Sequence, residues 1–214
     1  MKNTYKALII NGTIIALSLS VIYGLSLFKN DTTASNTIKK APLFTAIDSN
    51  GNKHKLADYK GKIIVLEWKN HLCPFVKKHY GSGNMQAIQK KLTKQGVIWL
   101  SIISSAKGKQ GYVTGDECNT IIKQEKSHAT AVLFDPKGTI GKEYGAKTTP
   151  HMFVINAEGQ IVYEGAIDSI RSADPKDIKK ATNYVVEAVN NVIKNKAIKP
   201  SQTAAYGCSI KYNY

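Results

Sequence analysis

The chain has 214 residues, with 30 basic and 15 acidic side chains and a formal net charge of +15. Nearly every basic residue is lysine and Arg171 is the only arginine, so we do not expect nucleic-acid binding, which usually depends on arginine forks. Three cysteines (Cys73, Cys118 and Cys208) are too few for a disulfide scaffold and cannot all pair internally. We expect one domain of ordinary size with a solvated, lysine-rich surface.

An apolar run begins at Ala7 and ends at Phe28, after two lysines. Its 22 residues would form a helix about 33 Å long, enough to cross a bilayer with the N-terminus inside. The alternatives are an uncleaved anchor and a cleaved signal peptide, for which Thr32-Thr33-Ala34 is an imperfect site. Both predict an exported, periplasmic or otherwise extracytoplasmic domain that contacts the membrane only through residues 1–28.

Residues 29–40 are polar and lack periodicity, which predicts a tether. The domain is then expected at 41–198, followed by a C-terminal tail at 199–214 that carries Cys208.

Strands and helices alternate along the predicted domain. We expect strands at 43–47, 53–56, 63–68, 97–103, 131–134, 151–155 and 160–164. We expect helices at 74–95 with a break at Gly81, at 116–126 with Asp116 as its cap, at 139–144 and at 177–194. The first two strands and the last two form hairpins. This order is typical of a mixed α/β sheet with helices on both faces.

Cys73 lies between a buried strand and a helix that starts at Pro74. The free N–H groups and the positive dipole end of such a helix lower the pKa of a thiol and make it nucleophilic. Neighbouring side chains would add positive or titratable charge: Lys69, His71, Lys77, Lys78 and His79. We therefore interpret Cys73 as a reactive thiol rather than an inert buried cysteine.

Six segments of the chain resemble a known family. They are residues 41–48, 56–68, 70–80, 108–114, 144–155 and 206–212. The first three resemble the redoxins, thioredoxin-fold proteins that include AhpC/TSA relatives and periplasmic thioredoxin-like proteins. The last three are similar to the peroxiredoxin-like branch. The resemblance covers roughly 42–212 and implies a thioredoxin fold with an N-terminal β-hairpin extension.

The resemblance also implies a substrate groove. Thr149-Pro150 matches the family's cis-proline, which lies beside the reactive cysteine, and the backbone before that proline can pair with an extended substrate. The residues implied for the groove are Thr149, Pro150, Trp68, Pro74 and Phe75.

Two side chains are candidates for moving the proton of Cys73. Glu67 lies six residues before Cys73, close to where thioredoxins keep a buried acid that relays protons. The alternative is that the end of its strand reaches solvent. His71 is the second candidate. A soft metal bound by His71, Cys73 and His79 is disfavoured by the helix start between them, so we expect no metal and no cofactor.

The chain departs from the family in two respects. Val76 stands where thioredoxins have the second cysteine of Cys-x-x-Cys, so no local disulfide can form. Leu66 and Asn70 stand where typical peroxiredoxins have Pro and Thr, and Arg171 is far away in the sequence. The second departure weakens the case for a peroxidase, although a lysine or histidine could substitute as the donor.

A thiol that reacts with disulfides or peroxides must be regenerated. The tail from Pro200 to Cys208 could span up to about 26 Å, and the domain's radius of gyration should be about 15–16 Å. Cys208 can therefore reach Cys73. Cys118 and an external thiol are the alternatives, and Cys208 could instead be a structural thiol that anchors the tail.

The leading hypothesis is an exported thiol-disulfide oxidoreductase that uses the single reactive thiol of Cys73, with Cys208 as the candidate resolving cysteine. Its partners would be protein thiols and disulfides or small peroxides, together with an external reductant. The alternatives are a peroxiredoxin-like, antioxidant thiol peroxidase and a non-catalytic thioredoxin-fold module that binds a partner protein.

Overall fold

The computed structural model describes residues 39–213. The apolar segment 7–28 and nearly all of the predicted tether lie outside the described residues. Within the described residues, no helix is both long enough and apolar enough to span a bilayer.

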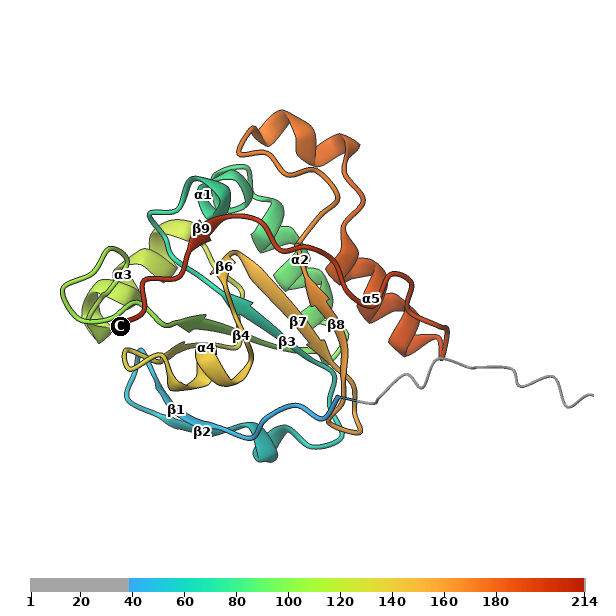
Figure 1. Cartoon of the computed structure of the whole chain (residues 1–214), viewed down its shortest axis with the longest axis horizontal. Coiled ribbons are helices and arrows are strands. Elements are labelled where there is room, and N and C mark those ends of the chain that lie inside the picture. Colours follow the sequence, from blue (N-terminus) through green and yellow to red (C-terminus); the bar gives the residue numbers. More distant parts are fainter. Residues whose placement is uncertain (1–38, 214) are drawn as a thin grey trace, which may run out of the picture. The chain divides into compact units, whose positions relative to one another are not determined.

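A seven-stranded mixed sheet in the order β2-β1-β5-β4-β3-β7-β8 lies at the centre of the domain (Figure 1). Its strands β3, β4 and β5 are parallel, and β7 runs antiparallel to β3. The bounds are β1 Thr45–Asp48, β2 Lys53–Lys55, β3 Ile64–Trp68, β4 Ile98–Ile103, β5 Ala131–Phe134, β7 His151–Ile155 and β8 Ile161–Gly165. The predicted mixed sheet and both predicted hairpins are confirmed.

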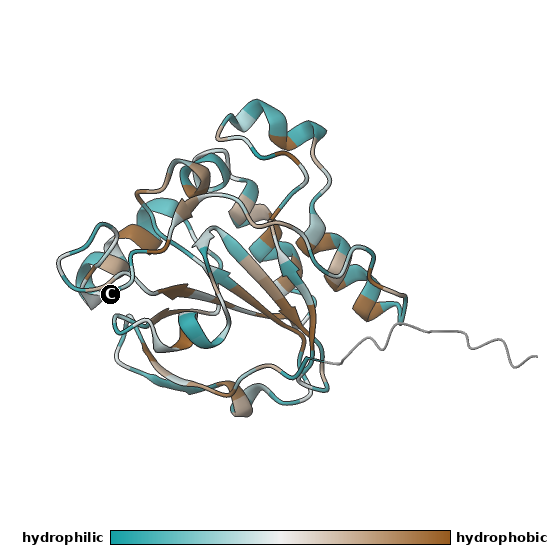
Figure 2. Ribbon diagram, viewed as in Figure 1, coloured by the Kyte–Doolittle hydropathy of each residue, from teal (hydrophilic) through white to brown (hydrophobic). Residues whose placement is uncertain are grey.

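Helices cover both faces of the sheet because its central strands are apolar on both sides, as the brown strands of Figure 2 show. One face packs on α1 (Pro74–Gly81), α2 (Asn84–Thr93), α3 (Gly115–Glu125) and α5 (Tyr184–Ile193). The other packs on α4 (Thr139–Glu143) and the 3-10 helix η1 (Leu56–Tyr59). The predicted break near Gly81 is confirmed.

The predicted cap of α3 is wrong. The helix is capped by Thr114 rather than Asp116, through a capping box. The Thr114 hydroxyl accepts from the Glu117 N–H at 3.4 Å, and the Glu117 carboxylate accepts from the Thr114 N–H at 2.7 Å. Two reciprocal hydrogen bonds satisfy more of the free helix end than one aspartate cap would.

The single helix predicted at 177–194 is also wrong. The chain forms the 3-10 helix η2 (Pro175–Lys180), becomes extended at Ala181 and starts again as α5. Asn183 caps α5 by accepting the N–H of Val186 at 2.9 Å. An asparagine that bonds the backbone ahead of it favours a new helix start over continuation.

A second, two-stranded sheet joins the C-terminal tail to the domain. In it β6 (Thr148–Thr149) pairs antiparallel with β9 (Cys208–Ser209), with Thr149 opposite Cys208. Figure 1 shows the tail, in red, passing α1 before it reaches β9 beside β6. Beyond β9 the side chains of Ile210 and Tyr212 are buried in the core under α4. The tail is therefore part of the packed domain.

Candidate active site around Cys73 and Cys208

Cys73 is the N-terminal cap of α1, and Pro74 occupies the first turn of the helix. The Cys73 carbonyl accepts hydrogen bonds from the N–H groups of Val76 at 3.0 Å and Lys77 at 2.9 Å. Proline at this position loses no hydrogen bond, because the first helical N–H groups have no partner within the helix. The thiol is fully buried, at 0% exposure.

The sulfur atoms of Cys73 and Cys208 lie 2.8 Å apart, with both thiols free. A disulfide bond is about 2.05 Å long, so less than about 1 Å of movement would join them. Cys118 is buried in a separate cluster under α3, and burial raises its pKa to about 11. Of the two candidate partners within the chain, the structure places Cys208 beside Cys73.

The cis-proline turn faces the Cys73 thiol. The Thr149-Pro150 peptide bond is cis, as the sequence predicts, and the Cys73 thiol donates to the Thr149 carbonyl at 3.0 Å. Gly207 has φ +141°, and a Cβ at this position would lie 2.1 Å from the Thr149 oxygen. Only glycine therefore allows the tail to approach the turn so closely.

The two thiols differ in acidity. Burial opposes ionisation of Cys73, but interactions with the side chains of Cys208 and Thr149 and with the backbone of Val76 and Cys208 outweigh it, and the pKa is lowered. The bond to the Thr149 carbonyl is made only by the protonated thiol and is not what lowers the pKa. Burial and the adjacent Cys73 raise the pKa of Cys208 to about 11. Cys208 is also partly exposed, whereas Cys73 is not. The pair thus combines a buried, acidic thiol with an accessible, protonated one.

The expected contribution of nearby positive charge is not what lowers the pKa of Cys73. Lys69 and Lys78 form buried ion pairs with Glu125 and Asp168. The pKa of His79 is lowered to about 4, mainly by burial, so this imidazole is neutral near pH 7. The charges of Lys69 and Lys78 are therefore compensated in the fold, and hydrogen bonds rather than nearby cations lower the pKa of Cys73.

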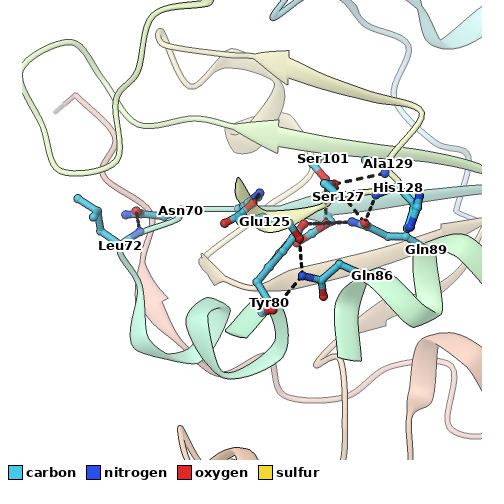
Figure 3. A network of polar contacts seen from close by, with 12 residues as sticks. Asn70, Leu72, Tyr80, Gln86, Gln89, Ser101, Glu125, Ser127, His128 and Ala129 are labelled. Carbon is cyan, nitrogen blue, oxygen red and sulfur yellow. Dashed lines mark hydrogen bonds and ion pairs between the residues drawn. The ribbon is translucent and has the colours of Figure 1, made fainter. Parts of the chain in front are cut away.

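Glu67 is fully buried, so the alternative that its strand end reaches solvent is wrong. Its carboxylate accepts from the Tyr80 hydroxyl at 3.0 Å, Trp99 Nε1 at 2.9 Å and the Ser101 hydroxyl at 2.8 Å. Gln89 Nε2 lies 3.4 Å from it, and Figure 3 shows Tyr80, Gln89 and Ser101 converging in this network. Within the described residues no hydrogen bond joins Glu67 to Cys73, and a role in proton relay stays a prediction.

His71 is half-buried next to α3, and its Nδ1 atom has no hydrogen-bond partner among the described residues. Burial, together with Lys69 and Lys77, lowers its pKa. The imidazole is therefore neutral near pH 7 and can accept a proton. No hydrogen bond to Cys73 is found in the described part of the chain, so this role also stays a prediction.

The C-terminal tail covers part of the implied groove, at Thr149 and Phe75. Trp68 does not line it, because its side chain is 0% exposed, donates to the Ser104 hydroxyl at 3.1 Å and packs on the α4 side of the sheet. Strand alternation sends Glu67 and Trp68 to opposite faces. Phe75 packs on Tyr206 of the tail with ring centroids 5.7 Å apart, while Pro74 is exposed.

Sequence reasoning missed the pairing of β6 with β9 and the contacts that hold it. Two-residue strands carry no periodic signal, and the polar Thr148-Thr149 pair gave no sign of a partner. Asp168, which accepts a hydrogen bond from the Tyr206 hydroxyl, was also missed. The glycine between Tyr206 and Cys208 was the one local sign of a close backbone approach.

Comparisons with known proteins concern the family and the fold. The profile of the AhpC/TSA family matches residues 38–164, more than half of the chain. The thiol-disulfide oxidoreductase ResA of Bacillus cereus is 25% identical over 175 residues, covering 79% of this chain and 94% of ResA.

Two solved structures are similar in fold. A hypothetical protein from Sinorhizobium meliloti has a TM-score of 0.69 and 24% identity, covering 82% of this chain and 94% of its own. A protein described as a thiol:disulfide interchange protein DsbE, from Chlorobium tepidum, has a TM-score of 0.50 and 23% identity, covering 67% and 92%. The predicted thioredoxin fold is confirmed.

Proposed function

The chain belongs to the AhpC/TSA family, and on that premise we propose that it is a thiol-disulfide oxidoreductase in which Cys73 and Cys208 form the redox pair. One observation carries the proposal: the two sulfur atoms lie 2.8 Å apart at the start of α1. The similarity to ResA, whose name describes this activity, supports it.

The two thiols have properties suited to different steps. The Cys73 thiolate attacks one sulfur of a substrate disulfide, forming a mixed disulfide and releasing the other sulfur as a thiolate, which takes up a proton. The Cys208 thiol then loses its proton and attacks Cys73, and the second substrate sulfur leaves as a thiolate that takes up a proton. Two electrons have passed from the pair to the substrate, and an external reductant must return them.

The edge of β6 is where an extended substrate would bind. Backbone pairing there is already made by β9, which lies opposite Thr149 in antiparallel register. A protein substrate that presents a cysteine in an extended segment would make the same backbone hydrogen bonds. The substrates proposed are therefore extended protein segments that contain a disulfide or thiol, and they compete with the tail for Thr149.

Proton transfer is proposed for His71 and Glu67 in different ways. The lowered pKa of His71 keeps the imidazole neutral, and its Nδ1 has no partner among the described residues, so this nitrogen is free to accept a proton, although the lowered pKa makes it a weaker base. The Glu67 carboxylate is held by several donors within the network of α1, α2 and β4, so any transfer through it would need another group in between.

The peroxidase alternative has less support from the site. Peroxide cleavage needs a donor that holds the leaving oxygen. The neighbours of the Cys73 sulfur are the Cys208 thiol and the Thr149 carbonyl, and a carbonyl oxygen cannot donate to a leaving oxygen. The Asn70 amide, near where peroxiredoxins have their threonine, faces Gln110 instead at 3.4 Å.

Export across a membrane is proposed on the sequence alone. It rests on the apolar run from Ala7 to Phe28 and the two lysines before it. In either the anchored or the cleaved form, the Cys73–Cys208 pair would work in a compartment that permits disulfides.

The test is reduction of a peptide disulfide with dithiothreitol as the external reductant. Wild-type protein should accelerate this exchange, Cys73→Ser should abolish the acceleration, and Cys118→Ala should keep it because Cys118 lies in a separate cluster. A wild-type protein that consumes peroxide but exchanges no disulfide would favour the peroxidase. Activity in neither assay, together with binding of a partner by Cys73→Ser, would favour the binding module.

A further inference from the structure

Buried charged and polar side chains gather where the C-terminal tail passes α1. The cluster consists of Lys78, His79, Asp168 and Tyr206, and none of the four is more than 3% exposed. Asp168 connects them. Its Oδ1 accepts hydrogen bonds from the Tyr206 hydroxyl and from the backbone of Ile170 at 3.1 Å, and its Oδ2 accepts from Lys78 Nζ at 3.2 Å.

The protonation states within the cluster follow from these contacts. Burial and the neighbouring Asp168 raise the pKa of Tyr206, so its hydroxyl remains a donor. His79 is neutral, with Nδ1 bonded to the Asn84 amide at 2.8 Å. Lys78 is then the counter-ion that makes a buried aspartate tolerable, and the bond from Tyr206 to Asp168 is charge-assisted.

The cluster connects the two chain segments that carry the reactive thiols. Lys78 lies on α1, the helix that Cys73 caps, and Tyr206 lies two residues before Cys208. The Tyr206 ring also packs edge-on against Phe75 in the first turn of α1. Gly207, between Tyr206 and Cys208, allows the backbone of this segment to lie directly against Thr149.

We propose that Asp168, with Lys78 as its counter-ion, is a positioning residue that holds the Tyr206 hydroxyl and thereby presents Cys208 to Cys73. The inference rests on the proposed function, because it concerns how that redox pair is assembled. Without the hydrogen bond from Tyr206 to Asp168, the tail would sample positions away from Cys73, and the effective concentration of the Cys208 thiol at Cys73 would fall.

The quantity to measure is the equilibrium between the two thiols and glutathione disulfide. In the forward reaction the Cys73–Cys208 bond forms, the bond of glutathione disulfide breaks, and two glutathione molecules leave carrying the two electrons and two protons. The equilibrium constant is a direct measure of how well the fold brings the two sulfur atoms together.

Tyr206→Phe removes the hydroxyl and keeps the ring on Phe75. We expect the equilibrium constant to fall about tenfold, because a charge-assisted hydrogen bond that favours the assembled pair is lost. That fall corresponds to a reduction potential about 30 mV less negative. The oxidised protein should melt at a higher temperature than the reduced protein, and this difference should be smaller in Tyr206→Phe than in the wild type.

Tyr144→Phe is the matched control. It removes a buried tyrosine hydroxyl that donates to the Pro42 carbonyl at 2.8 Å on the α4 side of the domain. It should lower the melting temperature of both forms and leave the equilibrium constant unchanged. A Tyr206→Phe protein with the wild-type constant would overturn the positioning role while leaving the proposed function intact. A wild-type protein that forms no Cys73–Cys208 disulfide would overturn both.

Discussion

The Cys73 and Cys208 sulfur atoms lie 2.8 Å apart although the two residues are 135 positions apart in the sequence. The pairing of β9 with β6 brings them together, because it sets Cys208 opposite Thr149, whose carbonyl accepts a hydrogen bond from the Cys73 thiol. The helix after Cys73 has Val76 where a second cysteine could stand. The candidate partner of Cys73 lies on the C-terminal tail instead.

Gly207 should control how closely the tail approaches the cis-proline turn. Gly207→Ala places a Cβ where only 2.1 Å separates it from the Thr149 oxygen, at a φ of +141°. We expect the tail to shift and the Cys73–Cys208 equilibrium constant in glutathione buffers to fall by more than about tenfold, since a sulfur displaced by about 1 Å no longer bonds without strain.

Gly159→Ala is the control for that substitution. Gly159 also has a positive φ, of +77°, but nothing lies within 4 Å of a Cβ there. It should cost about 1 kcal/mol of folding stability and leave the equilibrium constant unchanged. Equal effects of the two alanines would show that backbone strain alone, and not contact with Thr149, is responsible.

The lowered pKa of Cys73 should be visible in a titration of the thiol and in the pH dependence of stability. Thiolate absorbance of the reduced protein, after subtraction of a Cys73→Ser titration, should show a midpoint below the ordinary value of 9.0, while Cys208 should titrate at about 11. Between the lowered pKa and 9.0 the unfolded chain binds more protons at Cys73 than the folded chain does.

The contribution of Cys73 to stability should therefore be present above pH 9.0 and be lost as the pH falls through the lowered pKa. Urea unfolding of reduced wild-type and Cys73→Ser protein at several pH values measures it. A difference between the two proteins that does not vary with pH would contradict the acidic thiol.

The sequence predicts the sheet, most helix positions, the place of Cys73 at a helix start and the cis-proline turn, because these depend on local apolar runs and on Pro74 and Pro150. It predicts the wrong cap for α3 and one helix in place of η2 and α5, because Thr114 and Asn183 act through side-chain bonds to the backbone. For Cys208 the sequence shows only that an extended tail is long enough to reach Cys73. It does not predict the pairing of β9, because a two-residue strand has no periodic pattern.

Glu67 should matter for stability whether or not it relays protons. In Glu67→Gln a single amide oxygen replaces a carboxylate that accepts from Tyr80, Trp99 and Ser101, and the new NH₂ group meets donors. We expect a loss of about 2–4 kcal/mol in the free energy of unfolding, measured in urea.

Ser101→Ala is the control, because it removes one donor and leaves the carboxylate. If Glu67 relays the proton of Cys73, Glu67→Gln should also shift the pH profile of Cys73 alkylation, and Ser101→Ala should not. Identical profiles for all three proteins would leave Glu67 with a structural role alone.

The oxidised pair should be attacked at Cys208. Cys73 is 0% exposed and Cys208 is partly exposed, and the sulfur with the lower pKa is the better leaving group. A glutathione thiolate should therefore form a bond to Cys208 and release Cys73 as a thiolate. Acid quenching early in the reduction, followed by peptide mapping, should find glutathione on the peptide of Cys208. Glutathione found mainly on the peptide of Cys73 would show that Cys73 is attacked and Cys208 is the leaving group, contrary to this prediction.

The measurement that tests the central claim most directly is non-reducing peptide mapping of the wild-type protein after mild oxidation with glutathione disulfide. The account predicts one intramolecular link, between the peptides of Cys73 and Cys208, with Cys118 still a free thiol. A link between Cys73 and Cys118, or a Cys73 that remains unmodified under these conditions, would contradict it.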